Sequence, residues 1–149
     1  MYTRIVVGID GSELATKALR HAAKLSKETG AKLFVVTATE PSTLIAPGAE
    51  ALAVNTGAII LELEEAKANA AWATLAEAKT LLSLEGLSAE HLHVASSTAA
   101  DAIIKTAQQQ GADLIVMGSH GRRGLGRLLL GSQAAEVLAR STIPVLVVK

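Results

Sequence analysis

The amino-acid sequence predicts an α/β fold in which a parallel β-sheet is covered by helices on both faces. Short, continuous apolar runs alternate along the chain with segments of helical periodicity, and glycines follow three of the helical segments just before the next run. Strands that alternate with helices pair in parallel, and continuous apolar runs are typical of strands buried on both faces. With 149 residues, the chain has the length of a single domain, 1–149.

Strands are predicted where apolar residues follow one another without interruption. These runs are Ile5–Ile9, Leu33–Val36, Leu114–Met117 and Val145–Val148. A weaker run, His91–Ala95, alternates apolar with polar residues, as expected of a strand nearer an edge of the sheet.

Helices are predicted between these runs, where apolar residues recur at helical spacing. The patterns are Ala15, Ala18, Leu19, Ala22 and Leu25, then Ala68, Ala71, Leu75, Ala78 and Leu82, and later Ala99, Ala102, Ile103 and Ala107. Gly30, Gly86 and Gly111 follow these patterns, and glycine suits the left-handed residue that ends a helix. Thr98 and Asp101 have the spacing of a capping box, with Asp in place of the usual Glu.

Ligands of such sheets bind beyond the carboxyl ends of the strands, at the point where the strand order reverses. Those ends carry Asp10 and Gly11, then Thr37–Glu40, then Gly118 and Ser119, so this edge is the expected ligand site. The segment Pro41–Thr56 is rich in Pro, Gly, Ala and Thr and is predicted to be a loop that leads into a long second helix.

Composition and charge exclude several classes of function. Aromatic residues make up 2% of the chain and its net charge is zero, so it offers few rings for stacking on bases and no field that favours DNA or anionic lipid. No cysteine is present, which excludes disulfides and thiolate metal sites. The start, MYTRIVVGID, does not resemble a signal peptide, and no apolar run is long enough for a membrane span. We therefore expect a cytoplasmic protein with no nucleic-acid partner and no membrane insertion.

A glycine-rich segment follows the fourth predicted strand, Leu114–Met117, and carries the clearest chemical signal. It contains five glycines and three arginines between Gly118 and Ser132, and ends in Gly131-Ser132 before a helical pattern. Glycines let backbone N–H groups approach a polyphosphate closely, and a helix start favours an anion. The segment is neither a Walker A loop, because the lysine is missing, nor a GxGxxG motif after the first strand. A flexible connector, in which the glycines only permit turns, remains the alternative.

At this point the chain resembles the ATP-binding universal stress proteins. The spacing Gly-x2-Gly-x9-Gly-Ser, met by Gly118, Gly121, Gly131 and Ser132, matches their nucleotide loop. The opening RIVVGIDGS, the stretch GADLIVMGSHGRRGLGRLLLGS and the ending IPVLVVK also look like that family. The resemblance implies a Rossmann-like fold of the adenine nucleotide alpha hydrolase type with strand order 3-2-1-4-5. It also implies a bound ATP, or another adenine nucleotide such as AMP, ADP or a cyclic nucleotide.

The resemblance also implies roles for individual residues. Asp10 would help to hold a Mg²⁺ on the phosphates, with Ile9 and Gly11 lining the same edge. Thr37-Ala38 stands where the family usually has His-Val, so Ala38 would make a smaller contact with adenine. Met117 and Gly118 would meet the base and ribose. The residues expected around the phosphates are Gly121, Arg122, Gly131, Ser132 and Gln133.

Several candidates also have simpler interpretations. Asp10 could cap the turn into the first helix, and His120 could be a solvent-exposed loop residue. His21, His91 and His93 lack a carboxylate or cysteine at matching spacing, so packed or solvated histidines are favoured over a metal site. Trp72, alone in a helical pattern, favours packing over a platform for a base.

Three functions remain open from the sequence. The first is a regulatory module that holds ATP and acts in a stress response through an unknown protein partner. The second is a slow ATPase or a nucleotidyl or phosphoryl transferase, although no general base is placed by a motif. The third is a dimer that works without nucleotide. A homodimer is expected through Ile143–Val148, because family members pair their last strands and an apolar edge strand otherwise invites aggregation.

Overall fold

The computed structural model describes residues 1–42, 53–121 and 130–149. Its elements are β1 (Arg4–Gly8), α1 (Glu13–Thr29), β2 (Lys32–Thr39), α2 (Ala53–Leu84), β3 (Glu90–Ala95), α3 (Ala99–Gln110), β4 (Leu114–Gly118), α4 (Ser132–Arg140) and β5 (Val145–Val148). All five predicted strands are present, and their bounds differ from the prediction by at most a few residues. No helix in the described ranges is long and apolar enough to cross a membrane.

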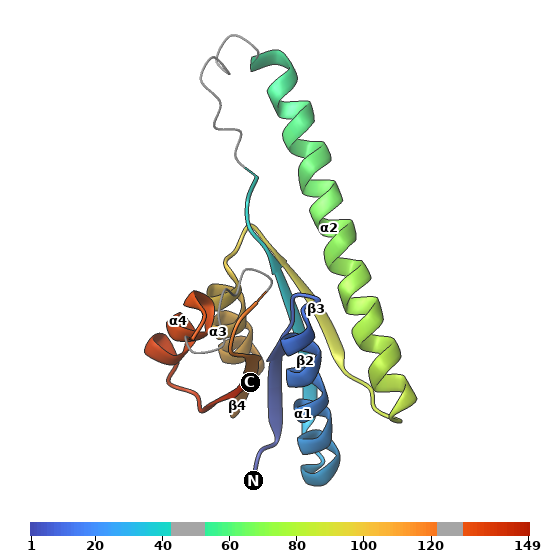
Figure 1. The fold of residues 1–149 in the computed structure, drawn as a ribbon, viewed down its shortest axis with the longest axis vertical. Coiled ribbons are helices and arrows are strands. Elements are labelled where there is room, and N and C mark those ends of the chain that lie inside the picture. Colours follow the sequence, from blue (N-terminus) through green and yellow to red (C-terminus); the bar gives the residue numbers. More distant parts are fainter. Residues whose placement is uncertain (43–52, 122–129) are drawn as a thin grey trace.

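The strands form one parallel sheet in the order β3-β2-β1-β4-β5, as predicted. Helices α1 and α2 cover one face of this sheet, and α3 and α4 cover the other (Figure 1). The core therefore lies in two aliphatic layers. Alternate residues of β1 divide between them, with Ile5 and Val7 in the α1–α2 layer and Val6 in the α3–α4 layer.

Strands β1 and β4 are adjacent although a long stretch of chain separates them, and a carboxylate holds their amino ends together. Asp113, just before β4, accepts hydrogen bonds from the Thr3 backbone N–H (2.8 Å), the Thr3 hydroxyl (2.7 Å) and the Arg4 backbone N–H (3.0 Å). Burial acts to raise the pKa of Asp113, but the hydrogen bonds from Arg4 and Thr3 outweigh it and lower the pKa. This contact fixes the pair of strands whose opposite ends form the expected ligand site.

The helix ends follow the predicted cap residues. Gly30 and Gly111 close α1 and α3 in the left-handed conformation, with φ of +72° and +61°. The Thr98 hydroxyl accepts from the Asp101 backbone N–H (3.2 Å), which confirms the first half of the predicted capping box. The Asp101 carboxylate pairs with Arg140 of α4 at 2.7 Å and thereby ties the two helices of one layer together.

Helix α2 is longer than the sequence pattern indicated. It begins at Ala53, so the prediction of a loop as far as Thr56 is wrong for its last four residues. The amino-terminal half of the helix extends beyond the sheet (Figure 1), and Ile59, Leu61 and Leu63 are exposed there. The helical spacing of apolar residues begins only near Ala68 because the buried side chains of α2 that pack on the sheet, Ala71, Leu75, Ala78 and Leu82, all lie in its second half.

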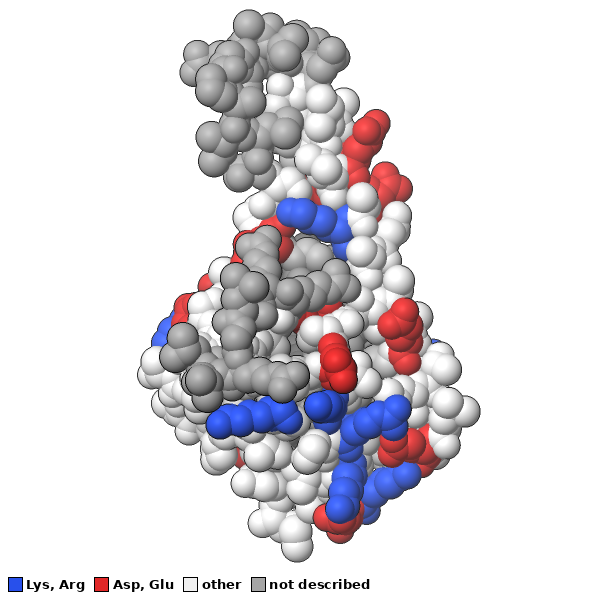
Figure 2. All heavy atoms as spheres, in the orientation of Figure 1, with Lys and Arg blue, Asp and Glu red and all other residues white. Residues whose placement is uncertain are grey.

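Charged side chains do not separate by sign on the face seen in Figure 2. Basic and acidic residues lie close together over the body of the molecule, and acidic residues continue along the side of the projecting helix. This distribution agrees with the zero net charge of the chain.

Candidate functional site

The candidate site lies at the carboxyl ends of β1 and β4, where the strand order reverses. From β1 the chain passes to α1 on one face, and α4, which follows β4, lies on the other face (Figure 1). The two connections therefore diverge at this edge. Such a divergence is the usual position of a ligand crevice in open α/β sheets.

The turn after β1 is built by side chain to backbone hydrogen bonds. Asp10 Oδ1 accepts from the Ser12 backbone N–H (2.9 Å), and Ser12 Oγ accepts from the Ala15 backbone N–H (3.2 Å). Ser12, and not Asp10, is the N-cap of α1. Between them Gly11 has φ of +81°, a conformation that residues with a Cβ rarely adopt. Asp10 therefore shapes the turn, which was the simpler interpretation of this residue.

The same carboxylate also reaches the glycine-rich segment. A Cβ placed on Gly121 would lie 2.5 Å from Asp10 Oδ2, so only glycine leaves room for the carboxylate at this position. The structure thus brings together two predicted site residues that are far apart in the sequence. One carboxylate oxygen is used in the turn, and the other lies at the start of the loop.

Ser119 holds the two ends of the β4–α4 connection together. Its backbone N–H donates to the Val148 carbonyl (2.8 Å), and its carbonyl accepts from the Gly131 N–H (2.7 Å). Its hydroxyl pairs with Nδ1 of His120 at 2.7 Å, and the residue is 2% exposed. Sequence reasoning placed Ser119 at the ligand edge but gave it no role, because no local pattern reveals a backbone anchor.

Helix α4 begins where Gly131 is bonded to Ser119, as predicted. Gly131 is its N-cap with φ of −61° and ψ of 155°, and no side chain caps the helix. Since the first backbone N–H groups of a helix have no partner within it, the start of α4 is suited to an anion. The Ser132 hydroxyl stands at the first helical position, beside these N–H groups.

Gln133 has a different contact from the one expected of it. Its Oε1 accepts from the Ala100 backbone N–H at the start of α3 (2.9 Å). The side chain therefore links the starts of α3 and α4. This hydrogen bond does not test the predicted contact of Gln133 with phosphate, which stays a prediction.

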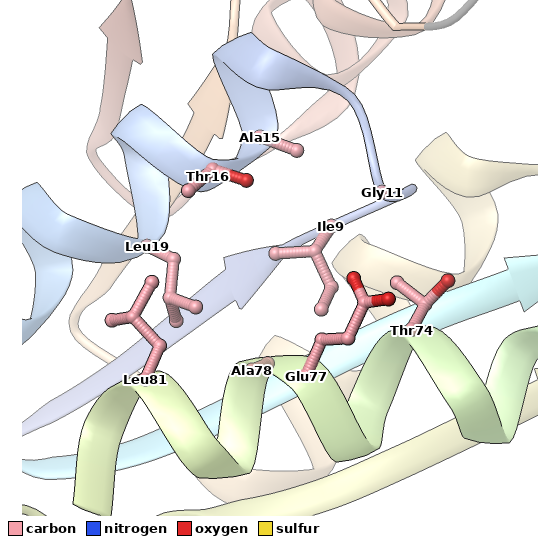
Figure 3. Close-up of a pocket in the computed structure, with 9 residues that line it drawn as sticks. All are labelled: Ile9, Gly11, Ala15, Thr16, Leu19, Thr74, Glu77, Ala78 and Leu81. Carbon is pink, nitrogen blue, oxygen red and sulfur yellow. The ribbon is translucent and has the colours of Figure 1, made fainter. Parts of the chain in front are cut away.

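The remaining predicted residues divide between the two faces of the sheet. Met117 is buried in the α3–α4 layer, and Ala38 packs against the same layer. Ile9 packs in the α1–α2 layer, where Ile9 and Gly11 line a separate pocket (Figure 3). Gly118 lets α1 approach β4, since a Cβ there would lie 3.1 Å from Leu14 Cβ. Arg122 lies outside the described residues, as do Arg123 and Arg127.

The histidines of β3 lie beneath α2. Nε2 of His93 is 2.8 Å from the Thr39 hydroxyl, and its ring meets Trp72 edge-on at 6.0 Å between centroids. Burial lowers the pKa of His91, which favours its neutral form. No group of three or more His, Cys, Asp or Glu side chains suited to a metal ion occurs in the described part of the chain.

The fold and the candidate site define a doubly wound α/β protein with glycines at the carboxyl ends of β1 and β4. The model of the universal stress protein family matches residues 1–149, and the chain belongs to this family.

Similar proteins cover the whole chain. It is 33% identical over 149 residues to universal stress protein MJ0531 of Methanocaldococcus jannaschii, which covers all of this chain and 83% of that protein. It is 31% identical to universal stress protein YxiE of Bacillus subtilis, with both chains covered completely. Among solved structures, protein MJ0577 superposes with a TM-score of 0.81 at 29% identity, covering 100% of this chain and 96% of the other. A universal stress protein in complex with cAMP superposes with a TM-score of 0.73 at 28% identity, covering 99% and 97%.

We expect Gly131→Ala to lower the free energy of unfolding by about 1–3 kcal/mol, because its Cβ would lie 2.9 Å from the Ser119 carbonyl oxygen. Ser119 cannot easily move away, since its backbone is bonded to both Val148 and Gly131. Gly57→Ala is the matched control: it lies within α2 with no described atom near its Cβ position, and should stabilise the fold by about 0.5–1 kcal/mol. Urea unfolding of both variants measures the difference. If the two variants unfold at equal urea concentrations, the contact between Gly131 and Ser119 has room for a Cβ and the prediction is wrong.

Proposed function

We propose that this chain is a regulatory module that binds ATP at the carboxyl edge of β1 and β4 and acts through a protein partner. The observation that carries the proposal is the start of α4, where Gly131 provides no capping side chain and is held against Ser119. The solved relative in complex with cAMP supports an adenine nucleotide as the ligand class. ATP is preferred to cAMP because a chain of phosphates can use several backbone N–H groups in the first turn of α4.

In this proposal each part of the nucleotide has its own neighbours. The phosphates lie against Gly121, Gly131 and Ser132, on backbone N–H groups of the first turn of α4, where the helix dipole adds to the attraction. The Gly131 N–H is not one of these donors, because it is bonded to the Ser119 carbonyl. Adenine lies towards Ala38 and Met117, which share the α3–α4 side of the sheet. The base and the phosphates are thereby placed along one edge, from β2 to the start of α4.

A Mg²⁺ on the phosphates would be held by Asp10. The residue fits this role because its Oδ2 lies against Gly121, beside the expected phosphates, while Oδ1 is used in the turn. Mg²⁺ commonly takes one or two carboxylates and otherwise water and phosphate oxygens, so one carboxylate is enough. The ion would offset the repulsion between Asp10 and the nucleotide.

Replacing Ser132 by Ala should weaken ATP binding about ten- to hundredfold, because one hydrogen bond to a charged acceptor is worth about 1.5–3 kcal/mol. Ser83→Ala, the same change at an exposed position of α2, should leave the affinity unchanged. Calorimetric titration with ATP, and then with cAMP as competitor, measures both variants. If the wild-type protein binds no adenine nucleotide, the proposed function is wrong; sustained release of phosphate would instead indicate an ATPase.

Asp10→Asn should weaken binding of Mg-ATP while metal-free ATP binds as well or better. The amide oxygen keeps an acceptor for Ser12, so the turn survives, and the lost charge removes both the metal ligand and the repulsion of phosphate. Titrations with and without Mg²⁺ measure the two affinities. Should both fall by the same factor, Asp10 acts only through the turn.

A homodimer through β5 completes the proposal. The strand pairs only with β4 in the described sheet, and its residues Val145–Val147 are partly exposed. We expect a dimer by analytical ultracentrifugation at micromolar concentration and a monomer for Val147→Arg, whose charge would lie beside the apolar side chains of a paired strand. Ala95→Arg, at the end of the opposite edge strand β3, should remain dimeric. A monomeric wild-type protein would contradict this assembly.

A further inference from the structure

A pocket between α1 and α2 lies on the opposite face of the sheet from Ala38 and Met117. Its volume is about 140 Å³, and it forms where small side chains, Ala15 of α1 and Ala78 of α2, line the space between the two helices (Figure 3). Ile9, from the end of β1, closes the side towards the sheet. The pocket is therefore separate from the proposed position of adenine.

The floor of the pocket is apolar. Ile9, Leu19 and Leu81 supply branched side chains, and the two alanines complete the surface. An apolar cavity of about 150 Å³ in another protein is large enough for benzene. The floor can thus cover an organic group of roughly one aromatic ring or a branched alkyl chain.

The rim of the pocket is polar and carries one negative charge. Figure 3 shows the carboxylate of Glu77 directed towards Ile9 and Gly11, with Thr74 beside it on α2 and Thr16 across the pocket on α1. No lysine or arginine lines the pocket, and Glu77 has no hydrogen-bond or ion-pair partner among the residues described. A carboxylate above an apolar floor selects a ligand that has a cationic donor on an apolar body.

We propose that this pocket binds small organic amines, with the ammonium group on Glu77 and Thr74 and the apolar body against Ile9, Leu19 and Leu81. The pocket does not overlap the expected phosphates, because none of the residues around them lines it, although Ile9 and Gly11 border both sites. A ligand of this size should bind with a millimolar dissociation constant. The Glu77 carboxylate favours a positively charged ligand, and the apolar floor limits the size of the ligand's apolar group.

The test is a titration of the isotope-labelled full chain with benzylamine, followed by amide NMR spectra without nucleotide. Benzylamine is cationic at neutral pH and carries one aromatic ring. We expect saturable shifts at Gly11, Thr16, Thr74 and Glu77. Phenylacetate has the same ring but a negative charge, and should bind more weakly. Absence of saturation, shifts confined to other surfaces, or equal binding of phenylacetate would overturn the proposal.

Two variants separate the charge from the cavity. Glu77→Gln, at an exposed position, should weaken benzylamine about two- to fivefold and remove the preference over phenylacetate. Ala78→Leu should fill the pocket and abolish saturable shifts, whereas Ala76→Leu, exposed on the same helix, should bind normally. Circular dichroism checks the fold of Ala78→Leu. If Ala78→Leu is unfolded, the benzylamine affinity of Glu77→Gln alone tests the proposal. Unchanged benzylamine affinity in Glu77→Gln would refute the assignment.

Discussion

The candidate site depends on one backbone hydrogen bond, from the Gly131 N–H to the Ser119 carbonyl at 2.7 Å. It joins the end of β4 to the start of α4 and so places the free N–H groups of that helix at the ligand edge. Ser119 is itself fixed by β5 through the Val148 carbonyl. An anion site made of backbone groups needs such an anchor, since no side chain holds its donors in place.

Gly121 and Gly131, at the two described ends of the loop, supply space and not unusual backbone conformation. Gly131 has an ordinary extended conformation, φ −61° and ψ 155°, which any residue can adopt. Its missing Cβ makes room for the Ser119 carbonyl, as that of Gly121 makes room for Asp10. Protein atoms therefore already occupy positions next to both glycines. The family spacing fits this packing of the chain on itself as well as it fits the approach of a phosphate.

Sequence reasoning predicted the sheet and its helix ends because these depend on local chemistry. Continuous apolar runs mark buried strands, and Gly30 and Gly111 meet a conformational demand that few other residues can meet. Features set by tertiary contact were not predictable. The start of α2 at Ala53 lies where no packing creates a periodic pattern, and the contact of Gln133 with Ala100 joins residues 33 positions apart. Ile9 lies on one face of the sheet, and Ala38 and Met117 lie on the other. This arrangement follows from the register of three strands, which no local pattern encodes.

The turn after β1 connects the two faces of the molecule within three residues. Ile9 turns into the α1–α2 pocket, Asp10 meets the loop at Gly121, and Gly11 at φ +81° both permits this reversal and lines the pocket. A group bound in the pocket touches the residues on either side of the carboxylate proposed for the metal. Any preference of an amine for one geometry of this turn would then change the affinity for Mg-ATP, and the nucleotide would change the affinity for the amine by the same factor. The sequence Ile9-Asp10-Gly11 thus joins the pocket directly to the proposed nucleotide site.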